Sequence, residues 1–342
     1  MDFKEKVKQI EFKDIEEFDS SELFSFYQMR NNKTCDTGLL DTYIWKDYYN
    51  IKIAIAYNKA VLVLMKDKQE YFAAMPYCKE EDLEEYFYLF QTYFNEILGK
   101  PFKIYLADED AIDYLKLTKK DDYIVKEEFD FKDYIYSAES LKNLSGKKFQ
   151  KKRNLINKFE KEYAGRWRYE SFSKYFCKIN SPSLTDANDF EKEKKNEIIF
   201  FLNNWYKDRE SDDTLEAEKN GIMKLLCGKI CYDFKIGAIY VDDKIRALSI
   251  GSYNEREKMA CISVEKGDTD IDGIYQIINR EFIRNEFPDA DIVNREDDMG
   301  AEGLRKSKES YNPIAFARKY MLLQKALGYK DEIDDYYEEM IN

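Results

Sequence analysis

The sequence contains no histidine among its 342 residues. Ser-His-Asp and Cys-His machinery, a histidine general base and histidine-ligated zinc are therefore excluded. Any chemistry must use carboxylates, lysine, arginine, tyrosine, cysteine or backbone groups.

Long apolar runs are also lacking. The longest near-continuous run, AIAYNKAVLVLM, is too short and too interrupted to span a bilayer. The N-terminus, MDFKEKVKQIEF, has no apolar segment of the kind that forms a secretory signal. We therefore expect a soluble protein of the cytoplasm, and its net charge of −13 makes it acidic.

Cysteines are few and scattered. Only Cys227 and Cys231 lie close together, and no second pair completes a four-ligand metal site. We expect six reduced, mostly buried thiols and no bound metal. Neither a GxGxxG nor a Walker pattern is present, and we predict that the protein uses no cofactor.

The length predicts two domains, and two halves of the chain share an order of elements. Each half reads as a helix, a β-hairpin, a strand, an amphipathic helix and a further strand. The hairpins are IKIAIAY with AVLVLM, and KIGAIYV with IRALSIGSY. The amphipathic helices are EEDLEEYFYLFQTYFNEILG, which ends at Gly99, and GIYQIINREFIRNEF. This order predicts a mixed α/β (α+β) fold rather than a doubly wound sheet.

A basic segment separates the halves. From Ser145 to Lys161 it holds seven basic residues and one acidic residue, within an otherwise acidic chain. Its pattern predicts a helix within 145–163, with Phe149, Ile156, Phe159 and Tyr163 near one face. The segment is either a solvated helix face at the joint or a phosphate-binding surface for a tRNA end, a nucleotide or a lipid headgroup.

A second candidate is VEKGDTDIDGIYQIIN, in which a strand ends, a loop follows and a helix begins near Gly273. Such a helix start can bind an anion, but Asp268, Asp270 and Asp272 would repel phosphate. A capped helix start is the simpler interpretation.

The third candidate is NREDDMGAEGLRKSKESYNP, residues 294–313. Five polar residues follow the apolar strand ADIV, at the sheet edge where ligands commonly bind. The next helix presents Arg305 and Lys308 on one face. A network of salt bridges is the alternative, but we favour a functional site.

These stretches carry a resemblance to a known family. DYIYSAESLKNLSGKKFQKKRNLINKFEKEY, VEKG…GIYQIINREF and the 294–313 segment resemble the bacterial DUF2156 family, and CDTGLLDTYIWKDYYNIKIAIAYNKAVLVLM resembles its N-terminal half. The family is similar to the C-terminal catalytic domain of phosphatidylglycerol lysyltransferases. Lys308 matches the first lysine of a K-x-K-F-x-P-like segment of those enzymes, and Ser310 replaces the second. The resemblance covers about residues 20 to 325.

The resemblance implies two tandem GNAT-like domains, of the acyl-CoA N-acyltransferase type, with mixed and mostly antiparallel sheets. We expect the N-terminal domain over 1–134, the C-terminal domain over 135–330 and an acidic tail over 331–342. It also implies kinship with aminoacyl-tRNA-dependent transferases. A GNAT acetyl-CoA site has a basic glycine-rich loop where this chain has DIDGIY, which argues against CoA.

The implied function is transfer of an aminoacyl group from aminoacyl-tRNA, or another phosphate-bearing partner, to a lipid headgroup or small acceptor. Such transfer needs neither histidine nor metal. The catalytic candidates are Glu296, Asp297 and Asp298, which would hold the aminoacyl ammonium or accept a proton, and Arg305 and Lys308, which would hold phosphate or the oxyanion. The candidates for substrate binding are Lys147, Lys148, Lys151, Lys152, Arg153, Glu265, Tyr275, Asn294 and Arg295.

Two alternatives remain open. The chain could be a non-catalytic ligand-binding protein on a duplicated GNAT scaffold, because a fold does not fix a function. It could also be an acyl-CoA N-acyltransferase. The sequence predicts no integral membrane segment and is compatible with peripheral membrane contact.

Overall fold

The computed structural model describes residues 2–68, 70–176, 189–209, 212–227 and 234–325. The predicted tail at 331–342 and the thiols of Cys177 and Cys231 lie outside these residues. Of the described cysteines, Cys35, Cys78 and Cys261 are buried free thiols and Cys227 is an exposed one. Within the described residues, no helix combines the length and the apolar character needed to cross a membrane.

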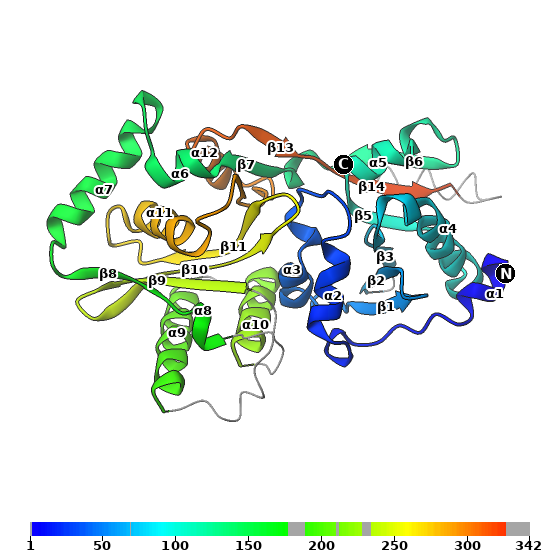
Figure 1. The fold of residues 1–342 in the computed structure, drawn as a ribbon, viewed down its shortest axis with the longest axis horizontal. Helices are drawn as coiled ribbons and strands as arrows, with labels where there is room; N and C mark the ends of the chain where they lie inside the picture. Colours follow the sequence, from blue (N-terminus) through cyan, green and yellow to red (C-terminus); the bar gives the residue numbers. More distant parts are fainter. Residues whose placement is uncertain (1, 69, 177–188, 210–211, 228–233, 326–342) are drawn as a thin grey trace.

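Two seven-stranded sheets form the framework (Figure 1). The first sheet has the order β1-β2-β3-β5-β14-β6, with β4 paired to β2. Its strands are β1 (Lys52–Ala56), β2 (Ala60–Asp67), β3 (Glu70–Ala73), β4 (Tyr77–Cys78), β5 (Lys103–Asp108), β6 (Tyr123–Glu127) and β14 (Lys319–Gln324). The second sheet has the order β13-β7-β12-β11-β10-β9-β8. Its strands are β7 (Asp133–Ser137), β8 (Trp167–Ser171), β9 (Phe234–Val241), β10 (Lys244–Asn254), β11 (Met259–Gly267), β12 (Ile292–Asn294) and β13 (Ala315–Ala317).

The predicted internal repeat is visible in the pairing. In the first half the hairpin β1–β2 is followed by β3, helix α4 and β5, and in the second half the hairpin β9–β10 is followed by β11, helix α11 and β12. Each half contains one parallel pair, β3 with β5 and β11 with β12, and the other pairs are antiparallel. The predicted class, mixed and mostly antiparallel sheets with helices, is therefore confirmed.

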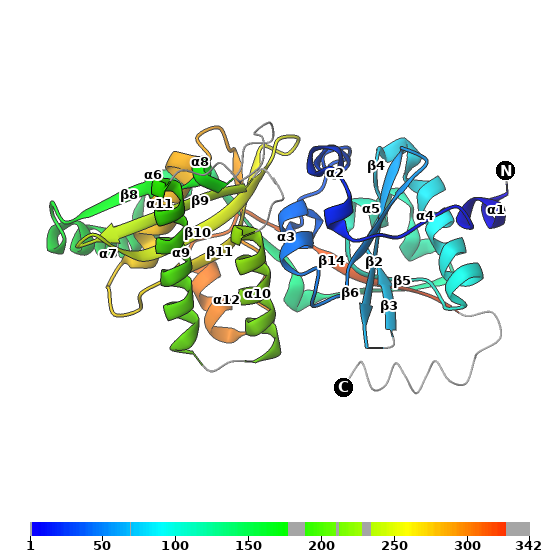
Figure 2. The same ribbon diagram turned by 90° about the horizontal axis from the view of Figure 1, so that it is seen from below.

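Helices cover both faces of each sheet (Figure 2). Those of the first half are α1 (Phe3–Val7), α2 (Ser20–Tyr27), α3 (Leu39–Ile44), α4 (Leu83–Tyr93) and α5 (Glu109–Tyr114). Those of the second half are α6 (Ala138–Asn143), α7 (Gln150–Glu162), α8 (Ser173–Phe176), α9 (Asp189–Lys207), α10 (Asp213–Cys227), α11 (Ile274–Glu286) and α12 (Glu302–Glu309). Gly99 takes the left-handed conformation predicted for the residue that ends the α4 segment, with φ of 64°.

One hydrophobic core joins the two halves. Leu40 and Ile44 of α3 belong to the same buried cluster as Leu225 and Leu226 of α10. Gly221 allows this close approach, because a Cβ atom there would lie 2.0 Å from the carbonyl oxygen of Ile44. Two further cores lie on the outer faces of the sheets, one under α4 and one under α11.

The chain crosses between the sheets near its end. Strand β13 pairs with β7 at the edge of the second sheet, and the next strand, β14, lies between β5 and β6 of the first. Figure 1 shows this crossing as a continuous ribbon from one half to the other. The joint between the sheets is therefore built from both ends of the chain.

Candidate active site

The segment after β12 enters this joint. The side chain of Asn294 is fully buried, and its Nδ2 donates to the carbonyl oxygen of Lys33 at 2.7 Å and to Asp133 Oδ2 at 2.8 Å. Lys33 belongs to the first half of the chain and Asp133 begins β7. Through these two hydrogen bonds, Asn294 links the predicted site segment to both halves of the chain.

The ammonium of Lys319, at the start of β14, lies at the centre of the joint. Its Nζ is 2.7 Å from Asp133 Oδ1 and 3.3 Å from Asp297 Oδ2, and it also pairs with Asp36. Burial alone would lower the pKa of Lys319, but the carboxylates of Asp133 and Asp36 raise this pKa well above its ordinary value. The lysine is therefore a permanent buried cation.

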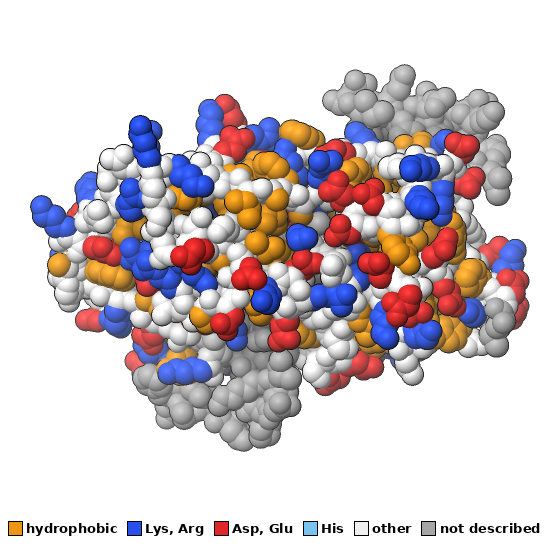
Figure 3. Space-filling view, turned by 45° about the horizontal axis from the view of Figure 1, so that its top comes forward, with side chains coloured by type: hydrophobic (Ala, Val, Ile, Leu, Met, Phe, Trp, Pro, Cys, Tyr) orange, Lys and Arg blue, Asp and Glu red, His pale blue; other side chains and the backbone are white. Residues whose placement is uncertain are grey.

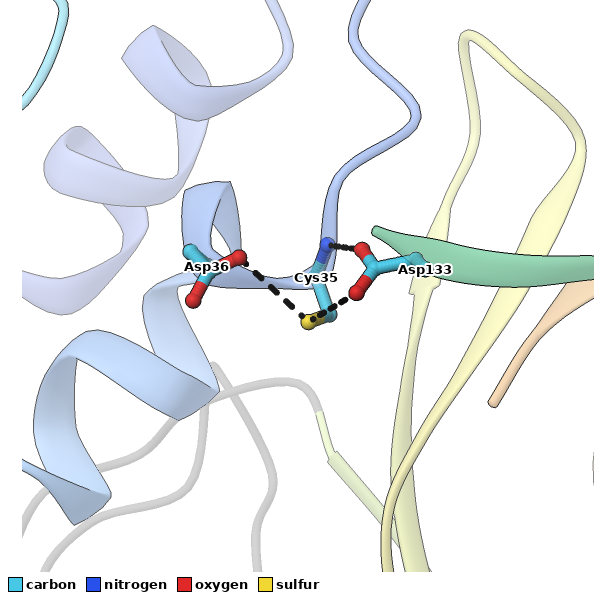
Figure 4. Close-up of side chains that lie close together, drawn as sticks. All are labelled: Cys35, Asp36 and Asp133. Atoms are coloured by element: carbon cyan, nitrogen blue, oxygen red, sulfur yellow. Dashed lines mark hydrogen bonds between the residues drawn. The ribbon is translucent and has the colours of Figure 1, made fainter. Parts of the chain in front are cut away.

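Cys35 belongs to the same cluster (Figure 4). Its backbone N–H donates to Asp133 Oδ2 at 2.7 Å, and its Sγ lies 3.3 Å from Asp133 Oδ1 and 3.6 Å from Asp36 Oδ2. Burial and the two neighbouring carboxylates raise the pKa of the thiol well above its usual range, so Cys35 stays protonated.

The spacing of these three side chains is one that a metal ion could bridge, since their ligand atoms lie within 4.8 Å of one another. The Nζ of Lys319 lies 3.5 Å from the sulfur of Cys35 and pairs with both carboxylates. The ammonium therefore already supplies the positive charge, and the residues do not fit a metal ion.

Carboxyl groups outnumber cations in the cluster. Burial, followed by the charge of Asp41, raises the pKa of Glu296 well above its ordinary value. Burial likewise raises the pKa of Asp297 to about 6 and that of Asp41 to about 7. Asp297 and Asp41 therefore exchange protons near neutral pH, as a general base does, and an excess of carboxyl groups over cations also favours a bound ammonium ion.

Lys308 supplies a second amine to the site. Its Nζ donates to the carbonyl oxygen of Glu296 at 3.1 Å and to that of Arg295. Burial and the nearby Arg295 lower the pKa of Lys308, although the charge of Glu296 opposes this shift. Glu296 itself has φ of 58°, and its N–H donates to Asn294 Oδ1 at 2.6 Å. The predicted residues Glu296, Asp297 and Lys308 thus lie together at the joint.

Asp298 and Arg305 form a separate pair. Arg305 Nε donates to Asp298 Oδ2 at 2.9 Å, and its Nη2 donates to Asp298 Oδ1 at 2.8 Å and to Asp130 at 2.6 Å. The hydroxyl of Tyr134 donates to the same carboxylate. The hydrogen bonds from Arg305 lower the pKa of Asp298 to about 2. These contacts fasten α12 to β7, so both side chains are engaged with each other rather than with the Lys319 cluster.

The remaining predicted ligand residues come from β11, α7, α11 and the residue after β12. Arg295 forms a salt bridge with Glu265 at 3.0 Å, and its guanidinium lies 4.7 Å from the ring centre of Tyr311. Lys152 Nζ lies 3.9 Å from the same ring, and burial lowers its pKa to about 8. The hydroxyl of Tyr275 donates to the carbonyl oxygen of Gly267, at the end of β11.

The basic segment forms the predicted helix, α7, with a preceding turn over Lys147–Phe149. Phe149, Ile156 and Phe159 are buried as expected. Lys147, Lys148 and Lys151 are exposed. Arg153 instead donates to the carbonyl oxygens of Leu144 and Gly146 and so stabilises the loop that precedes α7.

Cys35, Asp36, Asp41, Asp133 and Lys319 are members of the cluster that the sequence did not single out. A lysine at the start of the apolar strand ARKYMLL was one available signal, because a buried strand seldom carries an unpaired charge. The partners of this lysine come from three other regions of the chain, and no local pattern connects them.

Comparison with known protein families identifies one family that this chain matches. The family model described as "Phosphatidylglycerol lysyltransferase, C-terminal" matches residues 28–176 and 181–323. An uncharacterized protein of Mycoplasmoides gallisepticum is 29% identical over 192 residues. That match covers 55% of each chain, so the alignment spans about half the length of this curated relative.

Solved structures share the fold. A conserved protein of unknown function from Bacteroides thetaiotaomicron is 25% identical with a TM-score of 0.75, covering 93% of this chain and 100% of that one. The DUF2156 domain from Agrobacterium fabrum is 13% identical, with a TM-score of 0.62 and coverage of 94% of each chain. L-PGS from Bacillus licheniformis is 14% identical, with a TM-score of 0.62 and coverage of 93% of this chain and 94% of that one. The chain therefore has the fold of these domains, in agreement with the predicted mixed α/β class.

Proposed function

Because this chain belongs to the family of phosphatidylglycerol lysyltransferase C-terminal domains, we propose that it transfers an aminoacyl group from an aminoacyl-tRNA to a lipid headgroup or another small acceptor. The observation that carries the proposal is the cluster at the joint between the two sheets, where Asp297 lies 3.3 Å from the buried ammonium of Lys319 and Lys308 donates to the carbonyl oxygen of Glu296. The division into two domains at residue 134 and the location in the cytoplasm stay predictions.

In the proposed reaction the acceptor's hydroxyl oxygen bonds to the aminoacyl carbonyl carbon, and the bond from that carbon to the tRNA ribose oxygen breaks. Asp297 takes the proton of the acceptor and returns it to the leaving ribose oxygen, since a pKa of about 6 suits both steps near neutral pH. The cluster around Lys319 holds more carboxyl groups than cations, which supports binding of the aminoacyl ammonium group. Lys308 would stabilise the oxyanion, and no electron transfer is needed.

The surroundings of Gly273 disfavour the acyl-CoA alternative. Gly273 begins α11 with φ of 83°, and a Cβ atom there would lie 2.6 Å from the carbonyl oxygen of Leu155 in α7. Asp272, next to Gly273, forms a salt bridge with Lys158 of α7. A pyrophosphate at this helix start would meet α7 and carboxylates instead of open amide donors, so aminoacyl-tRNA is the better donor.

The substitution Asp297→Asn tests the proposal. We expect transfer from lysyl- or alanyl-tRNA to fall about 100-fold or more, because the proton acceptor is lost. The free energy of unfolding should not fall at pH 7.5, because the native state holds this buried carboxyl at a raised pKa. In the wild type this group's contribution to stability declines as the pH rises from about 4 to about 6, and the variant should lack that decline.

Two measurements check this prediction: release of the aminoacyl group from charged tRNA with phosphatidylglycerol present, and thermal unfolding as a function of pH. Glu302→Gln, at an exposed carboxylate of α12, is the control. It should change neither the release of the aminoacyl group nor the pH dependence of thermal unfolding. Lower stability with unchanged transfer per folded molecule would make Asp297 a structural residue and remove the proposed role.

The basic segment supports a second test. Replacing Lys147, Lys148 and Lys151 by alanine should weaken tRNA binding and flatten its salt dependence, because each lost phosphate contact removes about 0.7–0.9 from the slope of log K against log salt. Filter binding at several salt concentrations measures both effects. The control removes the same charge from Lys100, Lys119 and Lys126, which are exposed on the first half. Equal slopes for the two variants would exclude the basic segment as the tRNA contact.

A further inference from the structure

Two cationic side chains contact one aromatic ring beside the candidate active site. Lys152 Nζ of α7 lies 3.9 Å from the ring centre of Tyr311, and the guanidinium carbon of Arg295, the residue after β12, lies 4.7 Å from it. Tyr311 itself is buried, whereas both cations are partly exposed. We call Lys152 and Arg295 the cation pair. Its members are far apart in the sequence, so the fold brings them together.

The charge of the cation pair is only partly neutralised. Arg295 forms a salt bridge with Glu265 at 3.0 Å, and the second oxygen of this carboxylate accepts a hydrogen bond from Asn279 Nδ2 at 3.1 Å. Lys152 packs on the ring of Tyr311 and forms no salt bridge among the described residues. Burial, followed by the charge of Arg295, lowers the pKa of Lys152, and the charge of Glu265 opposes this shift. One carboxylate therefore faces two cations, in a chain whose net charge is −13.

Both members of the cation pair have hydrogen-bonding capacity left. Nη1 of Arg295 is buried and has no hydrogen-bond partner among the residues that the structure describes. Lys152 is partly exposed, and its ammonium group can donate three hydrogen bonds. Guanidinium and ammonium groups bind the oxygens of phosphate through charge-assisted hydrogen bonds. The chemistry of the cation pair therefore fits a phosphate group.

The cation pair lies between the basic segment and the candidate active site. Lys308 Nζ donates to the carbonyl oxygen of Arg295, so the pair adjoins the catalytic candidates. Lys152 belongs to the basic segment and directly follows the exposed Lys148 and Lys151 along the chain. Figure 3 shows Lys and Arg side chains over the end of the molecule where α7 lies. A polyanion that runs along the basic segment therefore reaches the cation pair at the border of the active site.

We propose that the cation pair binds the phosphate of the 3′-terminal nucleotide of the donor tRNA. This inference rests on the proposed function, because the same nucleotide carries the aminoacyl ester. A phosphate bound at Lys152 and Arg295 places that ester next to Lys308, since Lys308 contacts the backbone of Arg295. The buried ring of Tyr311 is covered by the two cations and does not stack on a base. Recognition therefore depends on the phosphate and not on the identity of the base.

Binding of deacylated tRNA tests the cation pair without any transfer reaction. The wild type should bind intact tRNA about tenfold more tightly than tRNA trimmed of its 3′-terminal nucleotide, because trimming removes one charge-assisted phosphate contact. Lys152→Gln should bind the two RNAs with nearly equal affinity. Lys244→Gln, at an exposed lysine of the same half, is the matched control and should keep the tenfold preference. Filter binding at one fixed salt concentration measures these affinities, and thermal unfolding checks that both variants are folded.

The pH dependence distinguishes Lys152 from an ordinary surface lysine. The preference of the wild type for intact tRNA should decline as the pH rises from about 7 to about 9, because Lys152, with a pKa of about 8, loses its proton in this window. A surface lysine with a pKa of about 10.4 would give no such decline. The other groups that face Lys152 are the guanidinium of Arg295, the carboxylate of Glu265 and the phenol of Tyr311, whose pKa burial raises to about 12. Lys152→Arg keeps its charge throughout and should keep the preference at every pH.

Three results would overturn the proposal. Lys152→Gln might keep the wild-type preference for intact tRNA, or it might weaken binding of intact and trimmed tRNA by the same factor. It might also raise only the KM of glycerol 3-phosphate offered as a soluble acceptor, which would assign the cation pair to the phosphate of the acceptor. A wild type that prefers intact tRNA but transfers no aminoacyl group would instead refute the proposed function, and the cation pair would remain an RNA-binding site.

Discussion

Replacement of Lys319 by methionine is expected to lower the free energy of unfolding by about 3–5 kcal/mol, the range for removing one partner of a buried ion pair. The lysine side chain is completely buried, and Asp36, Asp133 and Asp297 all lie within salt-bridge distance of its Nζ. Without the ammonium these carboxylates would repel one another in a site that is largely shielded from water. Urea denaturation monitored by tryptophan fluorescence measures the loss.

Two further variants test whether the loss of stability is due to the buried ammonium of Lys319. Lys306→Met removes an exposed lysine of α12 that pairs with Glu302, four residues earlier, and should change stability by less than about 0.5 kcal/mol. Adding Asp133→Asn to Lys319→Met should restore part of the loss, because one uncompensated charge is removed. A Lys319→Met protein as stable as the wild type would mean that the carboxyl groups do not depend on this cation.

Gly221→Ala is expected to destabilise the protein by about 1–3 kcal/mol or more, the range for overpacking a core. In an exposed helix the same change stabilises by about 1 kcal/mol, because glycine is a poor helix former. Here the added methyl group would lie 2.0 Å from the carbonyl oxygen of Ile44, a backbone atom that cannot rotate away. Helix α10 must move off α3, which opens the core shared by the two halves.

Gly303→Ala provides the comparison for thermal and urea unfolding. Gly303 is also helical, in α12, and a Cβ atom there would meet nothing within 4 Å. This variant should therefore be as stable as the wild type or slightly more stable. If both alanine variants raised the melting temperature, the close contact between α10 and α3 would not exist in solution.

The sequence predicted the parts of the fold that depend on local patterns. The alternating segments around Asn58 and around Asp243 became the hairpins β1–β2 and β9–β10, and the amphipathic segments became α4 and α11. The segment predicted as helical from Leu39 ends its helix early, at Ile44. Periodicity identifies an element well but fixes its boundaries poorly, because the ends depend on tertiary contacts.

The candidate site could be predicted only in part. The run after β12 placed Glu296 and Asp297 correctly at a strand end, since that position follows from chain order alone. Their partners Cys35, Asp133 and Lys319 meet only when β14 crosses to the first sheet. The same limit explains Asp298 and Arg305, whose pairing with each other depends on how α12 packs on β7.

The position of β14 has a consequence for synthesis on the ribosome. Strands β5 and β6 of the first sheet make their ladders with β14, which lies between them and follows every strand of the second sheet in the chain. The nascent first half therefore emerges with open strand edges that stay unpaired until the second half has been translated. The first sheet therefore cannot complete its pairing before β14 has been synthesised, and we expect the edges of β5 and β6 to stay open until Lys319 and its strand arrive.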